Sequence, residues 1–577
     1  MLNEFEFNKT TRIGSITYVD TTEVVIEIEN ESLIPQIVIG NIVSIDTTRK
    51  HVKIIGIIEK VIRKYAKDNE ENGEKEYLFK DIIKVYLIGT FKSAYRLHRN
   101  VFSRGIETFP QLESGCHIIN RENLEFFMNS LSRSGKTGLE LGNFSIDKSA
   151  KAVLDGDKFF QRHAAILGST GSGKSWCVAK ILEKASLLKY SNLIVLDIHG
   201  EYNSLCKGKN SIAENYKVAG PGDLNSDEEK ILFLPSWILN KEELLSMILD
   251  RSDLNAPNQN SRFIHHVRKL KEKTIEEKPY IKESFTVDSP IPFDFNELIQ
   301  LLERDDTEKV PGSGTKEKNG EFNGKLTRFI SRLRTKVEDK RYGFMFQPHD
   351  KCRKYEWMYE LLEKLMISND GKKGIKIIDF SEVPSDILPI VTGIIARMIF
   401  DIQLWMDDTK RTPITLVCDE AHLYLPKKDE TDSVEKKSLF NFERIAKEGR
   451  KYGVSLLVIS QRPSEVSATI LSQCGNFIVL RLTNDLDKGT VKNLLPDGLK
   501  VIIEQLPFLD VGEAITIGDA ILLPSRIRLE EPLIKPNSNT RRFWNDWDTL
   551  ISDKEKIIDA IERIRGQNKN ISIKNDK

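Results

Sequence analysis

The stretch from Gly168 to Ser175, with the sequence GSTGSGKS, constrains this chain more than any other feature. An apolar run at 163–167 precedes it, and a helix-like segment at 176–184 follows it. Closely spaced glycines allow the backbone to wrap around an anion with several N–H groups directed at it, and the start of a helix adds a favourable dipole. The pattern, placed between a strand and a helix, predicts a polyphosphate-binding loop in a parallel α/β sheet.

The residue types in this loop indicate that its ligand is a nucleoside triphosphate with Mg²⁺, and we expect ATP. Lys174 is expected to reach the β and γ oxygens of the nucleotide, and the Ser175 hydroxyl to be a Mg²⁺ ligand. The residues expected to contact the nucleotide are Gly168, Ser169, Thr170, Gly171, Ser172, Gly173, Lys174, Ser175 and Trp176.

A second segment supplies two carboxylates. Asp419 and Glu420 follow the apolar run 414–418, which is typical of a parallel strand buried on both faces. An acid at such a strand end holds Mg²⁺, usually through water, and this role suits Asp419. Glu420 is then placed to polarise the water that attacks the γ-phosphate. The alternative is two acids at an ordinary strand end, but beside a phosphate loop the pair favours ATP hydrolysis coupled to motion over a GTPase or a small-molecule kinase.

Two further strand ends carry polar candidates. Asp197, His199 and Glu201 lie at the end of the apolar run after the phosphate loop, and Gln461 follows a later run. Strand ends in an open parallel sheet face the ligand crevice, so the first three are expected near the nucleotide. Gln461 can sense the γ-phosphate. The alternatives are a local turn for the first group and capping of the turn at Pro463 for Gln461.

Composition limits the class of protein. The 577 residues contain 86 basic and 86 acidic side chains, so any nucleic-acid contact must come from a local basic surface. The six cysteines are scattered without a C-x-x-C pair, which predicts neither a disulfide framework nor a zinc site. The N-terminus lacks the pattern of a signal peptide, and no apolar run nears the ~20 residues of a membrane span. We therefore expect a cytoplasmic protein that is not built into a membrane.

The first ~120 residues contain short strand-like runs separated by turn residues. Segment 23–29 alternates, with Val24, Ile26 and Ile28 on one face, and segments 41–46, 52–58 and 81–89 follow at turn-separated intervals. The rhythm predicts a small closed barrel or sandwich. No catalytic motif lies in this region, so we expect it to serve docking or assembly.

From about 137 the pattern changes to strands alternating with helices, which predicts a parallel sheet covered on both sides. The expected strands are 163–168, 192–198, 374–380, 414–420, 453–460 and 476–482, with an apolar helix at 384–401. Four amphipathic segments, 241–248, 263–273, 295–303 and 326–337, predict a helical insertion. Loops are expected at 305–325 and 427–437, a hairpin over 513–529 and a helix at 553–564.

These patterns divide the chain into four parts. They are an N-terminal β-barrel at 1–125, an ATPase core at 137–225 and 371–490, a helical insertion at 226–370, and a C-terminal hairpin, helix and tail at 491–577.

In combination, the motifs resemble the HerA family of hexameric DNA-translocating ATPases. The matching pieces are Arg162 to Ser175, Asp197 to Tyr202, Asp419 to His422, Glu448 to Gly453 and Ser460 to Pro463. The resemblance implies a RecA/FtsK-like P-loop core, a homohexameric ring, double-stranded DNA in its central channel, and a nuclease or other effector docked on one face.

The resemblance also implies two arginines that act across the subunit boundary. By position these are Arg162, twelve residues before Lys174, and Arg450, with Arg444 as the alternative to Arg450. An arginine supplied by a neighbouring subunit to the γ-phosphate is a common way to couple hydrolysis to subunit contact. The alternative for Arg444 and Arg450 is an ordinary solvated basic helix face.

Two functions from different classes fit these features. In the first, successive hydrolysis drags duplex DNA through the ring and feeds a NurA-like nuclease during end processing in recombinational repair. In the second, the ring clusters and activates a partner, such as a nuclease or a sirtuin-like NAD-consuming effector, in bacterial antiviral defence. The long insertion and the zero net charge favour defence over a minimal DNA pump. A conjugation-type pump ranks lowest because no membrane anchor is evident.

Overall fold

The computed structural model describes most of the chain between residues 11 and 568. Its gaps are 50, 72–73, 95–98, 120–123, 125–126, 128–137, 146–147, 312–316, 369–372, 428–432, 496–499, 539–540 and 550–552. The chain forms two compact units. Unit 1 comprises Met1–Ala185, Leu457–Ser464 and Leu471–Leu533, and unit 2 comprises Ser186–Leu456, Glu465–Ile470 and Ile534–Lys577.

Unit 1 begins with a small antiparallel barrel, which confirms the expected N-terminal fold. Its seven strands follow the order β2-β1-β7-β3-β4-β5-β6, and an extra pairing of β2 with β5 closes the sheet on itself. Alternate residues such as Ile13, Val24, Val43 and Ile54 point inward and form its core. The strands are β1 (Arg12–Val19), β2 (Glu23–Ile28), β3 (Ile42–Asp46), β4 (Val52–Glu71), β5 (Glu74–Ala94), β6 (Arg99–Ser103) and β7 (Gly115–Ile118).

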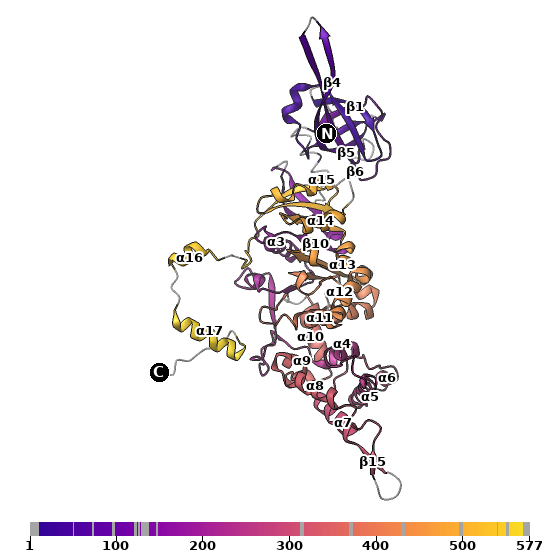
Figure 1. Cartoon of the computed structure of the whole chain (residues 1–577), viewed down its shortest axis with the longest axis vertical. Helices are drawn as coiled ribbons and strands as arrows, with labels where there is room; N and C mark the ends of the chain where they lie inside the picture. Colours follow the sequence, from indigo (N-terminus) through magenta and orange to yellow (C-terminus); the bar gives the residue numbers. More distant parts are fainter. Residues whose placement is uncertain are drawn as a thin grey trace. The chain divides into compact units, whose positions relative to one another are not determined.

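The hairpin of β4 and β5 is longer than the sequence pattern predicted, because both strands continue beyond the segments 52–58 and 81–89 into charged sequence. The hairpin extends past the barrel (Figure 1). Cross-strand pairs hold this extension, including a two-bond contact of Arg63 with Asp81 and the edge-on rings of Tyr65 and Phe79. Such pairs leave no periodic pattern of apolar residues in the sequence. A search for alternating apolar and polar residues therefore does not find this part of the strands.

The rest of unit 1 is a sheet built around the strand that precedes the phosphate loop. Strand β10 (Ala164–Leu167) pairs in parallel with Leu457–Ser460 of β18 (Val454–Ser460) on one side and with β19 (Asn476–Leu480) on the other. Antiparallel strands follow β19 in the order β20 (Glu513–Gly518), β21 (Ser525–Leu529), β8 (Gly138–Phe144) and β9 (Lys151–Asp155). Helices α2 (Gly156–Gln161) and α3 (Lys174–Ser186) flank β10 in the sequence.

Unit 2 carries a parallel sheet in the order β13-β12-β16-β11-β17. The strands are β11 (Leu193–Asp197), β12 (Ala213–Val218), β13 (Ile231–Leu232), β16 (Ile375–Asp379) and β17 (Ile414–Cys418). Strands β11 and β17 are largely Ile, Leu and Val and are buried on both faces, whereas β12 (AENYKV) is mixed and only partly buried. The expected α/β class with a parallel sheet is confirmed, and the six predicted strands recur with ends shifted by a residue or two.

Helices α11 (Leu388–Trp405) and α12 (Ser433–Glu448) belong to unit 2. They pack together, with Asn441 Nδ2 donating to Gly393 O over 3.1 Å. By length and composition α11 could cross a membrane, a feature that the sequence pattern did not predict, but 72% of it is buried inside the protein. It is therefore a core helix. The expected charged loop at 427–437 is wrong in its second half, since α12 already begins at Ser433; 428–432 lie outside the described residues.

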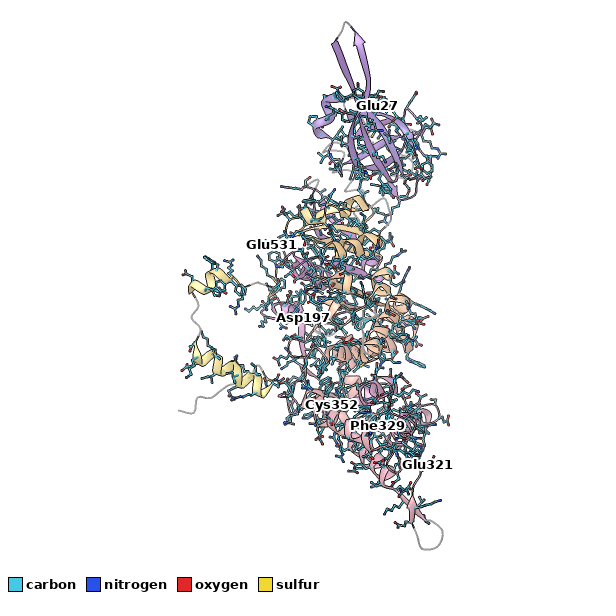
Figure 2. All side chains as sticks on the ribbon, in the orientation of Figure 1. Glu27, Asp197, Glu321, Phe329, Cys352 and Glu531 are labelled. Carbon is cyan, nitrogen blue, oxygen red and sulfur yellow. The ribbon has the colours of Figure 1, made fainter. Side chains whose placement is uncertain are left out.

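The four amphipathic segments predicted between 241 and 337 are helical. The helices of this region are α4 (Lys241–Ile248), α5 (Ala256–Thr274), α6 (Pro279–Lys282), α7 (Phe295–Thr307), α8 (Thr327–Glu338), α9 (Gly343–Phe346) and α10 (Trp357–Met366). Phe329 lies within it (Figure 2) and meets the ring of Phe263 edge-on at 6.0 Å. The predicted loop at 305–325 contains a short hairpin of β14 (Lys309–Pro311) and β15 (Glu317–Asn319). Because its strands carry charged residues, the sequence pattern does not predict them.

The C-terminal extension contains α16 (Phe543–Thr549) and α17 (Lys554–Gly566). No residue of either helix is buried within the described protein. The helix expected at 553–564 is thus present, and the preceding hairpin is formed by β20 and β21.

Candidate functional site

The phosphate loop lies at the carboxyl end of β10, in unit 1. Leu167, the last residue of that strand, is in register with Ser460 of β18 and Val479 of β19, so the loop starts at the centre of a parallel array. Gly171 and Gly173 have φ of +73° and +107°, in the region that favours glycine. The loop ends at Lys174, the first residue of α3.

Neighbouring backbone holds the loop from outside. Gly168 N–H donates to Ser460 O (3.3 Å), Ser169 N–H to Arg481 O (2.8 Å), and Gly512 N–H to Ser172 O (3.1 Å). By contrast, the N–H groups of Gly171 and Gly173 have no acceptor among the described residues. A preformed loop with unused N–H donors is the donor set that a phosphate requires.

Two side chains of the loop also fit a phosphate ligand. Lys174 is buried at 8% exposure, and its Nζ lies 3.3 Å from Ser169 O, so the ammonium group is folded back over the loop. The Ser172 hydroxyl is buried without a hydrogen-bond partner among the described residues. A side chain at Gly168 would lie 2.6 Å from that hydroxyl and fill the loop.

Gln461 belongs to the same part of unit 1. It directly follows β18, and its Oε1 accepts a hydrogen bond from the Thr170 hydroxyl. The predicted proximity of this amide to the phosphate loop is therefore present. The contact connects the end of β18 to the phosphate loop.

Unit 2 brings together a row of acids at the carboxyl ends of its parallel strands. Asp197 ends β11 and is in register with Asp379, which ends β16; on the other side, Leu196 is in register with Cys418, which precedes Asp419. Burial raises the pKa of Asp197 to about 7, with further increases from Asp379 and Glu201. Burial also raises the pKa of Asp419 well above its usual range, together with repulsion from Glu420 and Asp197. The carboxyl groups of this cluster therefore hold protons more readily than exposed ones do, and a nearby cation would stabilise their charged form.

Glu420 stands out by its backbone. It has φ 43° and ψ 46°, a left-handed conformation that is costly for a residue with a side chain. Its Oε2 lies 3.3 Å from His422 Nδ1, and both side chains are largely buried. Backbone strain of this kind gathers at functional sites, where the surrounding structure maintains it.

Asp197 also organises the turn behind it. Its two carboxylate oxygens accept the N–H groups of Glu201 (3.0 Å) and Tyr202 (2.9 Å), so its turn-forming role accompanies its place in the acidic row. His199 is exposed, and its side chain makes no contact with the described residues. Trp176 lies half-buried in the first turn of α3 in unit 1.

Asp379 is a residue of this cluster that sequence reasoning missed. It accepts a hydrogen bond from Asn203 Nδ2 (2.7 Å) and sits one strand away from Asp197. The signal was present, because 374–380 was an expected strand with an acid at its end. It was overlooked because no motif surrounds it.

Arg444 and Arg450 differ in the contacts that their side chains make. The Arg444 guanidinium lies over the Phe400 ring (4.5 Å) and near Asp401 (3.7 Å) and Glu448 (3.6 Å), so its own unit occupies it. Arg450 lies in the 3-10 turn η10 (Gly449–Tyr452) and is exposed, and its side chain forms no hydrogen bond or ion pair with the described residues. Of the two, Arg450 is the one available to a second molecule.

Arg162 lies in unit 1 just before β10. Its Nη1 donates to Asp519 Oδ2 in the turn between β20 and β21. Asp519 is a second residue that sequence reasoning missed, and nothing in the local sequence signals it because the two residues are 357 positions apart.

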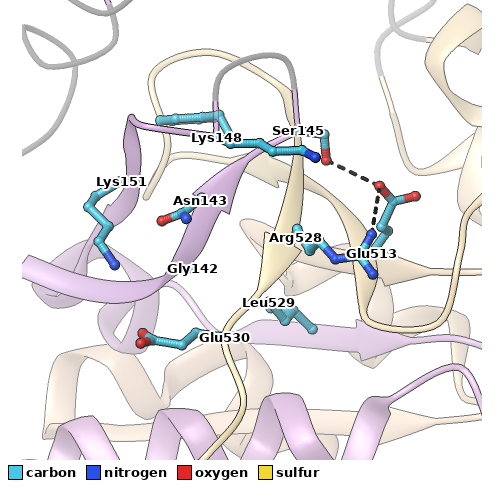
Figure 3. A pocket seen from close by; sticks show the side chains of 10 residues that line it. Gly142, Asn143, Ser145, Lys148, Lys151, Glu513, Arg528, Leu529 and Glu530 are labelled. Atoms are coloured by element: carbon cyan, nitrogen blue, oxygen red, sulfur yellow. Dashed lines mark hydrogen bonds and ion pairs between the residues drawn. The ribbon is translucent and has the colours of Figure 1, made fainter.

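A separate cavity of about 340 Å³ lies in unit 1 at the edge formed by β8, β9, β20 and β21 (Figure 3). Lys148, Lys151 and Arg528 lie on its walls, as do Glu513 and Glu530. Glu513 is tied to the neighbouring Arg526 and accepts the Asp510 N–H over 3.1 Å. Within the lining, Arg528 lies 4.0 Å from Glu513, whereas Lys151 pairs with Glu140 and Glu530 with Lys180 outside it.

As for metal ions, the described residues hold no group of three or more His, Cys, Asp and Glu side chains suited to bind one. The predicted Mg²⁺ ligands are instead one hydroxyl, Ser175, and one carboxylate, Asp419. Hard oxygen donors of this kind suit Mg²⁺, which is usually held by one or two carboxylates together with substrate phosphates and water.

Comparisons with known proteins agree with these features. The model of the HerA helicase central domain matches residues 139–399. A probable helicase of Methanocaldococcus jannaschii is 27% identical over 80% of this chain and 80% of that protein. The DNA double-strand break repair helicase HerA of Saccharolobus solfataricus is 29% identical over 64% of each chain. The HerA of Sulfolobus acidocaldarius is 28% identical over 67% of this chain and 68% of that protein.

Among solved structures, VirB4 of Thermoanaerobacter pseudethanolicus matches with a TM-score of 0.43 and 16% identity, covering 69% of this chain and 98% of that one. The expected family is confirmed by the central-domain match and by the named relatives. Residues 139–399 of this chain carry the central domain of the HerA helicase family.

Proposed function

We propose that the chain is an ATP-driven motor that acts on double-stranded DNA. The preformed phosphate loop from Gly168 to Ser175, with unused backbone N–H donors and a buried lysine, is the observation that carries this proposal. Four of the relatives bear the name of DNA double-strand break repair helicases, which supports DNA as the polymer on which the motor acts.

Residues of this chain divide the work of hydrolysis. The loop backbone and Lys174 bind the triphosphate, and Ser175 and Asp419 hold the Mg²⁺ that neutralises charge on the phosphate oxygens. Glu420 orients and deprotonates the attacking water. Gln461, bonded to Thr170, senses whether the γ-phosphate is present. The surroundings of the nucleotide are completed by Asp197, His199, Glu201 and Trp176.

The catalytic unit of this proposal is a homohexameric ring with duplex DNA in its central channel. Arg450 and Arg162 act on the nucleotide of the neighbouring subunit, where a guanidinium stabilises charge that develops on the transferred phosphoryl group. The freedom of Arg450, in contrast to the engaged Arg444, supports the choice between them. The contacts of the ring with DNA are to phosphates and depend steeply on salt.

The N-terminal barrel is the docking surface for a partner. An exposed rim on β1, β4 and β5 carries Tyr18, Tyr65 and Phe79, each about half exposed. Aromatic side chains of this kind are enriched in protein interfaces. We propose that the partner is a nuclease, which would act in DNA end processing in the cytoplasm.

The second candidate is antiviral defence, in which the ring activates an effector such as a sirtuin-like NAD-consuming enzyme. The long helical insertion favours it, whereas the names of the relatives support repair. Purification of the chain from its host with its bound partners distinguishes the two. A NurA-like nuclease supports the repair motor, and an NAD-consuming enzyme or another effector supports defence.

The test of the core proposal is ATP turnover with and without duplex DNA. Turnover that rises on addition of duplex and depends on Mg²⁺ supports a DNA motor. Binding of ATP without any turnover, under conditions in which the ring is assembled, would contradict it.

A further inference from the structure

An arginine of the barrel is anchored in the β20–β21 turn of the ATPase part of unit 1. Arg104 follows β6 directly, and its guanidinium donates to Leu522 O (3.1 Å) and Asp519 Oδ1 (3.3 Å). It also donates to the carbonyl oxygens of Gly518 and Ile521. A single side chain thus satisfies four acceptors of this turn, which makes it a specific contact and not a general attraction of opposite charges.

The same carboxylate holds a second arginine. Asp519 uses Oδ1 for Arg104 and Oδ2 for Arg162, so one acid lies between two guanidinium groups. The backbone of Arg162 is also fixed, because its carbonyl accepts the Gly475 N–H (2.7 Å) and Gly475 O accepts the Asp519 N–H (3.1 Å). The Arg162 side chain remains 42% exposed, so part of its guanidinium is available to another molecule.

The surroundings of these residues leave little freedom. A side chain at Gly518 would lie 2.3 Å from Gly475 O, and one at Gly475 would lie 3.1 Å from Arg162 Cβ. Asn476 connects the same strand ends, accepting the Ala520 N–H (2.7 Å) and donating to Lys158 O (2.9 Å). The turn that carries Asp519 is therefore packed directly against the backbone that carries Arg162.

We propose that Asp519 is a positioning residue that aims the Arg162 guanidinium at the neighbouring subunit's nucleotide and connects it, through Arg104, to the N-terminal barrel. This inference rests on the proposed function, in which Arg162 acts across the subunit boundary. It assigns a physical route from the barrel to the ATPase site. A partner that displaces Arg104 frees one oxygen of Asp519 and changes the direction in which Arg162 is held.

A purely stabilising role for Asp519 predicts a different outcome. Ion pairs between side chains that are a third or more exposed contribute little to stability, and Asp519 and Arg162 are 33% and 42% exposed. Loss of the carboxylate should therefore move the unfolding temperature by only a few degrees. Misdirection of a transition-state cation, by contrast, reduces turnover by roughly 10- to 100-fold.

Steady-state kinetics of the assembled full-length chain test the inference. Asp519→Asn keeps the size of the side chain and removes its charge, and we expect kcat to fall by about tenfold or more with KM for ATP unchanged within about twofold. Asp519→Glu should recover part of kcat. Asp519→Asn should add little to the loss caused by Arg162→Ala, because both changes remove one interaction. Asp485→Asn, at an exposed acid of the same unit that pairs with Lys488, is the matched control and should leave kcat unchanged.

Arg104→Ala tests the connection to the barrel. It should lower kcat by less than Asp519→Asn, and it should have no effect in the Asp519→Asn background. The inference would be overturned if the losses of kcat caused by the single changes multiplied in the double variants. It would also be overturned if Asp519→Asn raised KM and left kcat unchanged.

The proposed function and the inference fail in different ways. If Arg162→Ala itself leaves kcat unchanged, the role of Arg162 in the proposed function is wrong. If Arg162→Ala is inactive while Asp519→Asn is normal, only the positioning by Asp519 is wrong.

Discussion

At the scale of single residues, the proposed ATP hydrolysis depends on the charge that the phosphate loop offers to the triphosphate. Lys174 is the buried cation of the phosphate loop, and the loop supplies no other side-chain charge. Replacing it therefore removes the main electrostatic contact with the β and γ oxygens.

Lys174→Ala should reduce ATP turnover to background. A radioactive or coupled phosphate-release assay measures it, with Lys184→Ala, on the same helix and away from the loop, as the control. Near-normal turnover in Lys174→Ala would show that the loop is not the ATPase site.

Glu420→Gln separates binding from hydrolysis. The amide cannot accept a proton from the attacking water, so turnover should fall by roughly 100- to 10,000-fold while ATP still binds. Calorimetric titration with ATP checks the binding. A variant that no longer binds ATP would instead point to a structural role for Glu420, whose left-handed backbone makes that a real alternative outcome.

The buried acids also predict a pH dependence of stability. The pKa of Asp197 is raised to about 7 in the folded protein and is near 4 when unfolded, so between these values the folded state binds more protons. The free energy of unfolding should therefore fall as pH rises from about 4 to about 7. Asp197→Asn should flatten this slope, which thermal unfolding at several pH values measures; an unchanged slope would contradict the assignment.

At the scale of elements, the most informative contacts are the hydrogen bonds that join the insertion to the neighbouring helices of unit 2. Glu243, in a capping box at the start of α4, accepts hydrogen bonds from Arg397 of α11 (2.7 Å) and Asn441 of α12 (3.3 Å). Arg397 also donates to Ile238 O over 2.8 Å. Glu243 and Arg397 are both largely buried, at 9% and 15% side-chain exposure.

Arg397→Ala should lower the free energy of unfolding by about 3–5 kcal/mol, because it leaves the Glu243 carboxylate buried without its charged partner. Urea-induced unfolding measures this loss. Arg251→Ala, which removes an exposed partner of Glu242, should cost at most about 1 kcal/mol and is the control. Equal losses of unfolding free energy in the two variants would contradict the importance of the buried pair of Glu243 and Arg397.

Much of the element scale could be predicted from sequence, because its signals are local. Apolar runs and glycine spacing identify β10, β11, β16 and β17 and the phosphate loop. The extended β4–β5 hairpin could not be predicted, since its strands are held by cross-strand pairs such as Arg63 with Asp81. For the same reason Asp379 and Asp519 were not predicted, since their hydrogen-bond partners Asn203 and Arg162 lie far from them in the sequence.

At the scale of the whole molecule, the account requires subunits that complete one another's sites. Arg450 is exposed and unengaged within the described part of the chain, as a residue that serves a neighbour must be. Arg450→Ala should reduce turnover by about 10³-fold or more, in the range expected for the loss of an arginine supplied in trans.

Mixed rings test whether Arg450 acts in trans. Arg450→Ala subunits mixed with Glu420→Gln subunits should regain part of the activity, since an intact Glu420 site can then receive an intact Arg450 from its neighbour. The turnover of mixtures at several ratios measures this, with each variant alone as control. Mixtures without any recovery would place the role of Arg450 within its own subunit.

The most direct test of the central claim is ATP turnover per subunit as a function of chain concentration, with assembly state followed by sedimentation in the same buffer. Turnover per subunit should rise as subunits assemble and rise further with duplex DNA. A strictly monomeric chain that hydrolyses ATP at its full rate, with or without duplex, would contradict the central claim.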